Sequence, residues 1–206
     1  MKSSSETTPT RERVTHVLYL HGFRSSPLSA KAQTMGQRLT EVAPSVSWWC
    51  PQLPPSPAQA MHMLLDGVNA WPADRMAVVG SSLGGFYATF IAERLGCKAV
   101  VLNPAIHAAR DLTRAIGEHS LWHTPGERFF FKPDYVDELS ALAVNAITQL
   151  DRYYAVIAKG DEVLDWREMS AHYLGCKGVT QEGGDHAISN FEEHLPGILR
   201  FLDLRT

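Results

Sequence analysis

Cysteine is scarce in this chain, and the scarcity excludes two kinds of small-domain architecture. The sequence holds only 3 cysteines, Cys50, Cys97 and Cys176, which stand far apart. An odd and widely spaced set does not predict a disulfide framework or a zinc knuckle, whose cysteines come in pairs at short spacing. We expect each cysteine to fill apolar space in a protein kept reduced, and we therefore predict a cytoplasmic location.

The sequence also lacks a strong excess of charge and a long apolar run. Its formal net charge is -3, which gives no basic field for nucleic acid or an anionic membrane. No stretch is apolar over the length of a membrane-spanning helix, and residues 1–13 lack the apolar core of a signal peptide. We expect a disordered leader over residues 1–13, no nucleic-acid or membrane partner, and no metal or other cofactor. The oligomeric state is not predicted.

What is present is the composition of an ordinary globular protein. With 206 residues, 45% hydrophobic and 20% charged, the chain fits one domain with a sizeable core. Strand-like apolar runs alternate with longer helical patterns, which favours a doubly wound, mainly parallel sheet with helices on both faces. The fold class is therefore α/β, as a single domain over residues 14–206. The expected strands are 14–20, 46–49, 76–79, 98–102, 153–158 and 179–182.

The expected helices fill the intervals between these strands. The first is predicted to begin with Ser26 as N-cap and Pro27 as first residue, because a hydroxyl followed by proline is a typical helix start. The others are expected at 58–71, 83–95, 135–144, 165–174 and in the C-terminal tail. Between residues 105 and 133 the pattern weakens, and we predict a short helix and an irregular, lid-like excursion.

The stretch from Met76 to Gly85 is the strongest functional signal. Four apolar residues lead into Gly80-Ser81-Ser82-Leu83-Gly84, and an apolar helical run follows. This strand-turn-helix context is what a nucleophile elbow requires, since the residues two before and two after the nucleophile must be small. Only Ser82 has glycines at both positions, so it is the candidate nucleophile. A Gly/Ser turn without chemistry is the alternative interpretation.

A serine hydroxyl needs a base, and the base needs a group that orients it. Asp161 follows a predicted strand, and His186 lies in the loop after the last one. Loops at the carboxyl ends of parallel strands can converge, so we predict a catalytic triad of Ser82, Asp161 and His186.

Other acidic residues near Asp161 and His186 offer alternatives for the third member. Asp165 and Glu168 resemble a helix-capping pair, and Asp185 resembles a turn residue. Asp161 is favoured over Asp165 and Glu162.

The remaining histidines are less convincing as site residues. His119 and His123 are four residues apart and could share a helix face, but no carboxylate accompanies them. Solvated lid residues are a better interpretation than metal ligands, and no metal site is predicted.

An oxyanion hole for the same chemistry requires two backbone N–H groups. The N–H of Leu83 lies at a helix N-terminus, and the loop His21-Gly22-Phe23 after the first strand would supply the N–H of Phe23. His21 is expected to hold that loop by a hydrogen bond. We include His21, Arg24, Asn103 and Trp122 as possible substrate-pocket residues, although Arg24 could equally face water and Trp122 could equally pack within the excursion.

Several of these motifs together resemble a known family. The motifs are His21-Gly22-Phe23, the run from Ser25 to Ala32, the run from Gly80 to Gly85, Asn103-Pro104-Ala105, the run from Gly160 to Asp165, and the run from Glu182 to His186. In this order they resemble the small bacterial esterases labelled YqiA/YcfP-like, within the α/β-hydrolase superfamily. The resemblance spans nearly everything after the leader and implies a carboxylic-ester hydrolase with Ser82, Asp161 and His186 as the triad. Asp185 departs from it, because the family often carries Asn there.

The sequence hypothesis is therefore a serine carboxylesterase that acts on a small-molecule ester through an acyl-enzyme on Ser82. A thioesterase or amide hydrolase would use the same residues and is the alternative within enzymes. A catalytically silent binding protein on a hydrolase scaffold is the alternative of another class. The sequence identifies neither the physiological substrate nor the length of its acyl chain.

Overall fold

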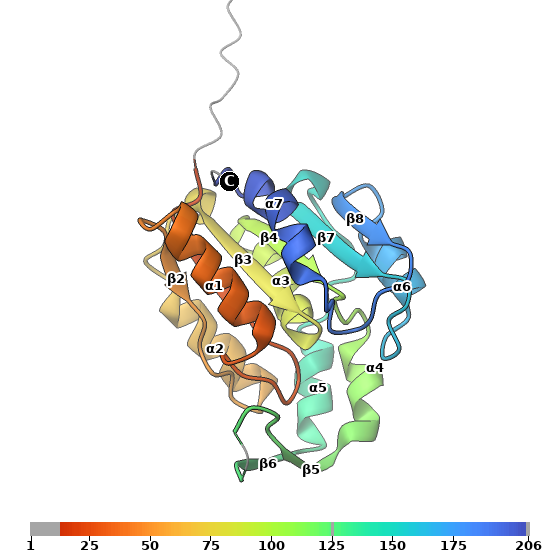
Figure 1. The fold of residues 1–206 in the computed structure, drawn as a ribbon. Coiled ribbons are helices and arrows are strands. Elements are labelled where there is room, and N and C mark those ends of the chain that lie inside the picture. Colours follow the sequence, from red (N-terminus) through yellow and green to blue (C-terminus); the bar gives the residue numbers. More distant parts are fainter. Residues whose placement is uncertain (1–12, 125, 205–206) are drawn as a thin grey trace, which may run out of the picture.

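A parallel sheet lies at the centre of the computed structural model, which describes residues 13–124 and 126–204 (Figure 1). The sheet is six-stranded in the order β2-β1-β3-β4-β7-β8, and every neighbouring pair is parallel. The prediction of an α/β fold with a mainly parallel sheet is confirmed. The strands are β1 (His16–Leu20), β2 (Ser47–Trp49), β3 (Met76–Ser81), β4 (Lys98–Leu102), β7 (Tyr153–Ala158) and β8 (Lys177–Gln181).

Helices cover both faces of this sheet. On one face lie α1 (Ala30–Val42) and α7 (Phe191–Phe201), whose apolar side chains share one buried cluster. On the other face the buried cluster takes its helical side chains from α2 (Pro57–Gly67), α3 (Leu83–Leu95), α4 (Ala108–Leu112), α5 (Asp134–Ala141) and α6 (Trp166–His172). Single 3-10 turns occupy Ala73–Arg75, Thr113–Ala115 and Leu150–Arg152.

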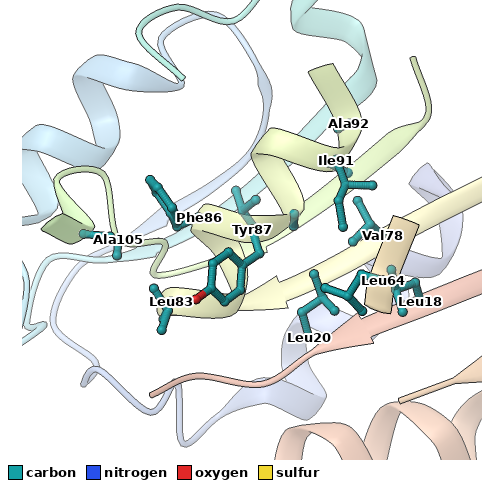
Figure 2. Close-up of a cluster of buried hydrophobic side chains, with 14 of the residues drawn as sticks. Leu18, Leu20, Leu64, Val78, Leu83, Phe86, Tyr87, Ile91, Ala92 and Ala105 are labelled. Atoms are coloured by element: carbon teal, nitrogen blue, oxygen red, sulfur yellow. The ribbon is translucent and has the colours of Figure 1, made fainter. Parts of the chain in front are cut away.

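The two clusters follow from the alternation of side chains along each strand. Leu18 and Leu20 of β1 belong to the cluster with α2 and α3, whereas Val17 and Tyr19 belong to the cluster with α1 and α7. Because successive side chains of a strand point to opposite faces, a strand buried on both faces must be apolar throughout. Figure 2 shows Leu18, Leu20 and Val78 of the sheet beside Leu64 of α2.

The strand order reverses next to β1, and this reversal positions the site. From β1 the chain runs through α1 to β2 on one side, and then through α2 to β3 on the other side of β1. In doubly wound sheets, a crevice opens where the strand order reverses, beyond the carboxyl ends of the two strands. The loop after β1 and the turn after β3 therefore face each other across this crevice.

The first helix begins later than the Ser26-Pro27 pattern predicts. Helix α1 starts at Ala30 with Ser29 as N-cap, so the predicted start was wrong. The Ser26 hydroxyl instead accepts a hydrogen bond from the Leu28 N–H at 3.1 Å and closes a local turn. Serine stabilises such turns by the same chemistry with which it caps helices, so the sequence pattern does not separate the two.

The excursion at residues 105–133 contains a hairpin that was not predicted. After α4, strands β5 (Gly117–Ser120) and β6 (Arg128–Phe131) pair as an antiparallel two-stranded sheet. Phe131 is buried whereas Phe130 is exposed, which is the alternation of a strand. Three consecutive phenylalanines hide that alternation in the sequence. The excursion is therefore irregular only between its short elements.

Two further expectations from the sequence concern the N-terminal leader and membrane-spanning helices. The predicted leader over residues 1–13 lies outside the described residues except for Arg13. Among residues 13–124 and 126–204, none of the helices combines the length and the apolar content that a membrane crossing requires.

The buried core predicts at which positions a shorter side chain destabilises the protein. Leu64 of α2 is fully buried in the cluster shared with β1 and α3. Leu64→Ala should lower the free energy of unfolding by about 2 to 5 kcal/mol, through lost burial and the cavity that remains. Urea denaturation measures this loss. Leu174→Ala is the matched control because Leu174 is 78% exposed, and a loss of similar size there would contradict the core assignment.

Candidate active site

Ser82 stands alone between the end of β3 and the first residue of α3. Its backbone has φ 56 and ψ -120, a combination that a residue with a side chain adopts only under strain. Hydrogen bonds from its backbone N–H and to its backbone carbonyl hold Ser82 in this conformation. The Ser82 N–H donates to the Leu102 carbonyl at 3.0 Å, and the Ser82 carbonyl accepts from the Ala105 N–H at 3.1 Å. The serine is therefore fixed by β4 and the loop after it.

The glycines around Ser82 give the chain the room to turn. A Cβ on Gly80 would lie 2.1 Å from the Gly84 carbonyl oxygen, and a Cβ on Gly84 would lie 2.0 Å from the Leu20 carbonyl oxygen. Both distances are far below any van der Waals contact, so neither position accepts a side chain without movement of the backbone. The spacing that identified Ser82 in the sequence thus reflects the close approach of α3 to β1 and β3.

Ser82, His186 and Asp161 form one hydrogen-bonded chain. The Nε2 atom of His186 lies 3.0 Å from the Ser82 Oγ, and Nδ1 lies 2.7 Å from the Asp161 Oδ2. Because an ionised carboxylate only accepts, Nδ1 carries the proton and Nε2 accepts from the serine hydroxyl. The Asp161 side chain is fully enclosed, whereas that of His186 is 17% exposed. The structure thus brings the three predicted residues together in the predicted order.

The loop after β7 fixes the orientation of the Asp161 carboxylate. Its Oδ1 accepts hydrogen bonds from the N–H groups of Val163 and Leu164, both at 2.8 Å. The loops that hold Asp161 and His186 also lie in contact, since a Cβ on Gly160 would lie 2.3 Å from the Gly184 carbonyl oxygen. With one oxygen held by the backbone, the other is directed at the imidazole.

The acidic alternatives to Asp161 are engaged elsewhere. Asp165 caps α6 by accepting from the Arg167 N–H at 2.9 Å. Glu162 accepts from the backbone N–H of His186 at 2.9 Å, and Asp185 accepts from the N–H and the hydroxyl of Ser189. None of these contacts reaches the imidazole ring.

Glu168 does not complete the predicted capping pair with Asp165. It forms two hydrogen bonds with the Arg110 guanidinium, at 2.7 and 2.8 Å. This contact holds the pKa of Glu168 below its usual value. The Arg110 partner lies 58 residues away in the sequence, where no local pattern indicates it.

The two predicted oxyanion donors flank Ser82. Leu83 is the first residue of α3, and the N–H groups of the first helical turn have no intrahelical acceptor. A Cβ on Gly22 would lie 3.2 Å from the Ser82 Cβ, so the loop that carries Phe23 passes directly beside the serine. Within residues 13–124 and 126–204 the Phe23 N–H has no hydrogen-bond partner. Both N–H groups thus belong to segments that adjoin Ser82.

The hairpin packs against the Phe23 side chain and so contributes to this loop. The Phe23 ring makes edge contacts with the rings of His119, Phe129 and Phe131, with centroids 5.1 to 5.7 Å apart. His119 in turn lies 2.6 Å from the Ala115 carbonyl through its Nε2 atom. His119 is therefore half-buried in aromatic packing rather than a solvated lid residue. No group of three His, Cys, Asp or Glu suited to a metal occurs in the described part of the chain.

His21 holds the loop after β1 from inside. Its Nε2 accepts from the Leu53 N–H at 3.1 Å, so its Nδ1 carries the proton and donates to the Gly22 carbonyl at 3.0 Å. Burial lowers the pKa of His21, and the hydrogen bond to Gly22 opposes this only in part. The neutral ring fixes the loop through both nitrogens, as the sequence analysis expects.

Asn103 is not a pocket residue, which corrects that expectation. Its side chain is completely buried, and it does not line the cavity beside Ser82. The amide nitrogen donates to the carbonyls of Asp185 and His186 at 2.9 and 3.2 Å, and the amide oxygen accepts from the Ala158 N–H at 2.8 Å. Asn103 therefore connects the end of β7 to the histidine loop, a role that no local pattern in the sequence indicates.

A cavity of about 940 Å³ opens beside Ser82 and His186. Ser82, His186, His21 and Phe23 line it, together with Trp122, which is 61% exposed. Arg24 does not line it. The Arg24 guanidinium lies 5.3 Å from the Trp122 ring and donates to the Ser120 carbonyl at 3.1 Å. Arg24 therefore contacts the excursion and not the interior of the cavity.

Solved structures of other proteins share the fold of this chain. Among solved structures, a putative hydrolase from Agrobacterium vitis S4 is similar with a TM-score of 0.71 at 17% identity, over 94% of this chain and 89% of that chain. Mouse α/β hydrolase domain-containing protein 10 has a TM-score of 0.67 at 13% identity, over 98% and 92%. Est1E from Butyrivibrio proteoclasticus with bound ferulic acid has a TM-score of 0.64 at 18% identity, over 91% and 87%.

At these identities the likeness concerns the fold, which is that of the α/β-hydrolase superfamily. The match in sequence is more direct, because a model of an uncharacterised protein family covers residues 16–203, the whole sheet and all three residues of the hydrogen-bonded chain. This chain belongs to the uncharacterised protein family UPF0227, the YqiA-like family that its motifs resemble, and it has the α/β-hydrolase fold.

Proposed function

We propose that this protein is a serine hydrolase that cleaves carboxylic esters. The observation that carries the proposal is the continuous hydrogen-bonded chain from Ser82 through His186 to Asp161, with Ser82 at a strained turn beside a cavity. A binding site would not need a strained serine, an aligned imidazole and an enclosed carboxylate in one row. Similar structures include the esterase domain of a Rhodothermus marinus protein and a monoacylglycerol lipase from Paleococcus ferrophilus.

In the acylation step, the Ser82 Oγ attacks the ester carbonyl carbon. His186 Nε2 takes the hydroxyl proton as the bond forms, and the Asp161 carboxylate stabilises the imidazolium. The carbonyl oxygen becomes negatively charged and accepts hydrogen bonds from the N–H groups of Leu83 and Phe23. Donors of this kind contribute about 3 to 4 kcal/mol each to transition-state stabilisation. The tetrahedral intermediate then collapses, and the alcohol leaves with the proton from His186.

Deacylation repeats these steps with water as the nucleophile. His186 takes a proton from water, the hydroxide attacks the acyl carbon on Ser82, and the same two N–H groups hold the oxyanion. The acid is released as Ser82 Oγ recovers the proton from His186.

The alternatives differ in the bond that is broken or in whether any bond is broken. A thioester or an amide would react through the same three residues, so the geometry by itself does not favour one leaving group. A catalytically silent binding protein would not depend on the alignment of Ser82 with His186. Both alternatives are decided by the measurements below.

The first prediction concerns the nucleophile. The parent protein should hydrolyse short 4-nitrophenyl esters, and Ser82→Ala should lower kcat/KM by about 10⁵-fold or more, to a small residual rate. Nitrophenolate release measures both rates. Ser81→Ala is the matched control, since its serine is the neighbour of Ser82 but lies outside the hydrogen-bonded chain. A parent inert to esters but active on thioesters would replace the esterase proposal, and a parent inert to both would favour a binding role.

The second prediction concerns the tautomer of His186. Asp161→Asn keeps the shape of the side chain, but its amide can donate to Nδ1 and thereby hold the imidazole in the wrong tautomer. We expect kcat to fall by about 10³-fold to 10⁴-fold, with KM little changed. Asp165→Asn should keep most of the activity. Equal losses in the two variants would contradict the assignment of Asp161.

The third prediction concerns Asn103. Asn103→Ala leaves the Ala158 N–H and the Asp185 and His186 carbonyls without their partner and frees the histidine loop. Because a displacement of about 1 Å costs roughly 100-fold in rate, kcat should fall by about 10-fold to 100-fold while KM changes little. Asn69→Ala, at an exposed position, is the control. An unchanged kcat in a folded Asn103→Ala protein would show that the loop does not need this contact.

A further inference from the structure

The cavity extends beyond the catalytic residues, between α1 and α7. From the α1 side it is lined by Lys31 and Thr34, from the α7 side by residues 188–193, and from the sheet by Tyr19 of β1. We call this part of the cavity the α1–α7 arm. The proposed hydrolysis mechanism uses none of these residues, so their polar groups remain to be explained.

The Tyr19 hydroxyl is the first of these groups. Tyr19 is fully buried, and its hydroxyl has no hydrogen-bond partner among the described residues. A buried hydroxyl without a partner is costly, and native proteins rarely keep one. Burial raises the pKa of Tyr19, so the hydroxyl retains its proton and remains a donor. The hydroxyl is enclosed, and an acceptor reaches it only at the wall of the arm that Tyr19 forms.

The Lys31 ammonium is the second group. One of its three N–H bonds is directed at the carbonyl oxygen of Ala187, the residue after the catalytic histidine. Within residues 13–124 and 126–204, no carboxylate lies within ion-pair distance of it, and no other lysine or arginine lines the cavity. Lys31 thus presents one positive charge and two further donors to the interior of the arm.

Burial and the neighbouring carboxylates have opposite effects on the pKa of Lys31. Burial lowers the pKa of Lys31 to about 8, and the carboxylates of Asp185 and Asp161 oppose this shift. The ammonium is therefore largely charged at neutral pH and loses its charge as the pH rises above 8. Asp185 is hydrogen-bonded to Ser189 and Asp161 to His186, so neither neutralises Lys31 by direct contact.

Three glutamates also line the cavity, but they differ from Lys31 in exposure. Glu162, Glu192 and Glu193 are all exposed. Glu162 accepts from the His186 N–H, and Glu193 accepts from the Asn190 amide. Water and salt screen exposed charges far more effectively than enclosed ones. The half-buried Lys31 and the buried Tyr19 hydroxyl therefore determine what the interior of the arm can bind.

We propose that the α1–α7 arm binds a carboxylate carried by the ester substrate, with Lys31 and Tyr19 as its two donors. This inference rests on the proposed function and specifies its substrate class, a half-ester of a dicarboxylic acid or an ester whose alcohol part bears a carboxylate. One ammonium matches one carboxylate in charge. The carboxylate also supplies the acceptor that the Tyr19 hydroxyl lacks, and a hydrogen bond to a charged group is worth more than a neutral one.

The test compares acidic and neutral esters of similar length. The acidic substrates are the mono-4-nitrophenyl esters of succinate, glutarate and adipate, and the neutral reference for glutarate is 4-nitrophenyl hexanoate. The parent should prefer the acidic ester at one chain length, where the carboxylate reaches Lys31 while the ester carbonyl lies at Ser82. An acetate ester of 3-hydroxybenzoic acid tests the alternative in which the carboxylate lies on the alcohol part.

Variants then assign the preference to the two residues. Lys31→Met should lower the acidic-to-neutral ratio of kcat/KM by about 10-fold or more, mainly through KM, because a charged hydrogen bond is lost. Lys31→Arg should restore part of the ratio. Tyr19→Phe should lower it by about threefold to tenfold. Lys132→Met is the control, because it removes the same charge at an exposed position outside the cavity.

Two further readouts separate this role from a structural one. In the parent, the acidic-to-neutral ratio should fall as the pH rises above 8, as Lys31 loses its charge. Tyr19→Phe should melt at the same or a higher temperature than the parent, because the hydroxyl it removes has no partner in the fold. A lower melting temperature with an unchanged ratio would assign Tyr19 to structure and overturn the proposal.

Binding distinguishes the failure of this inference from the failure of the esterase proposal. Monomethyl glutarate should bind to Ser82→Ala in calorimetry, and more weakly to the double variant that also carries Lys31→Met. If the parent cleaves no ester but the double variant binds monomethyl glutarate more weakly, the arm proposal stands and the proposed reaction fails. If the parent cleaves neutral esters and shows no preference at any chain length and for either carboxylate position, the arm proposal is wrong and the esterase proposal stands.

Discussion

The strained turn at Ser82 is the constraint on which the rest of the site depends. A backbone with φ 56 at a serine persists only where the surrounding structure fixes it. Here β1, β3 and the start of α3 approach so closely that Gly80 and Gly84 have no space for a Cβ. The same approach places the loop with Gly22 and Phe23 beside Ser82. One close contact between backbone segments thus positions the candidate nucleophile and its proposed oxyanion donors together.

The other half of the site is held by polar contacts rather than by close packing. Asp161 and His186 lie on loops after β7 and β8, and loops need hydrogen bonds to keep a fixed geometry. Backbone N–H groups hold the Asp161 carboxylate, and the Asn103 amide ties the histidine loop to the end of β7. Such a network works as a unit, because each member left without its partner in the interior carries a large cost. The alignment of Asp161 with His186 and the local stability therefore depend on the same contacts.

The two faces of the sheet divide the tasks of the molecule. The face with α2 and α3 holds the larger apolar cluster and supports the elbow. The face with α1 and α7 holds the second cluster, yet the cavity beside His186 is also lined by Lys31 and Tyr19. The Tyr19 hydroxyl has no internal partner among the described residues, and the Lys31 ammonium contacts the Ala187 carbonyl, so both support the proposed ligand. The proposed reaction thus lies at the carboxyl ends of the strands, and the proposed substrate selection lies beside it on the face with α1 and α7.

The sequence by itself determined the α/β class, the order of strands and helices, and Ser82 as the candidate nucleophile, because periodicity and glycine spacing are local properties of the chain. It misplaced the start of α1, where serine stabilises a turn as readily as a cap, and it missed the hairpin β5–β6, where three phenylalanines hide the alternation. Only the tertiary structure decided that Asn103 ties loops together and that Arg24 contacts the excursion. It also decided that Tyr19 and Lys31 line one cavity with residues 186–193. Those roles depend on partners 55 to 156 residues away along the chain, and no local pattern records contacts at such separations.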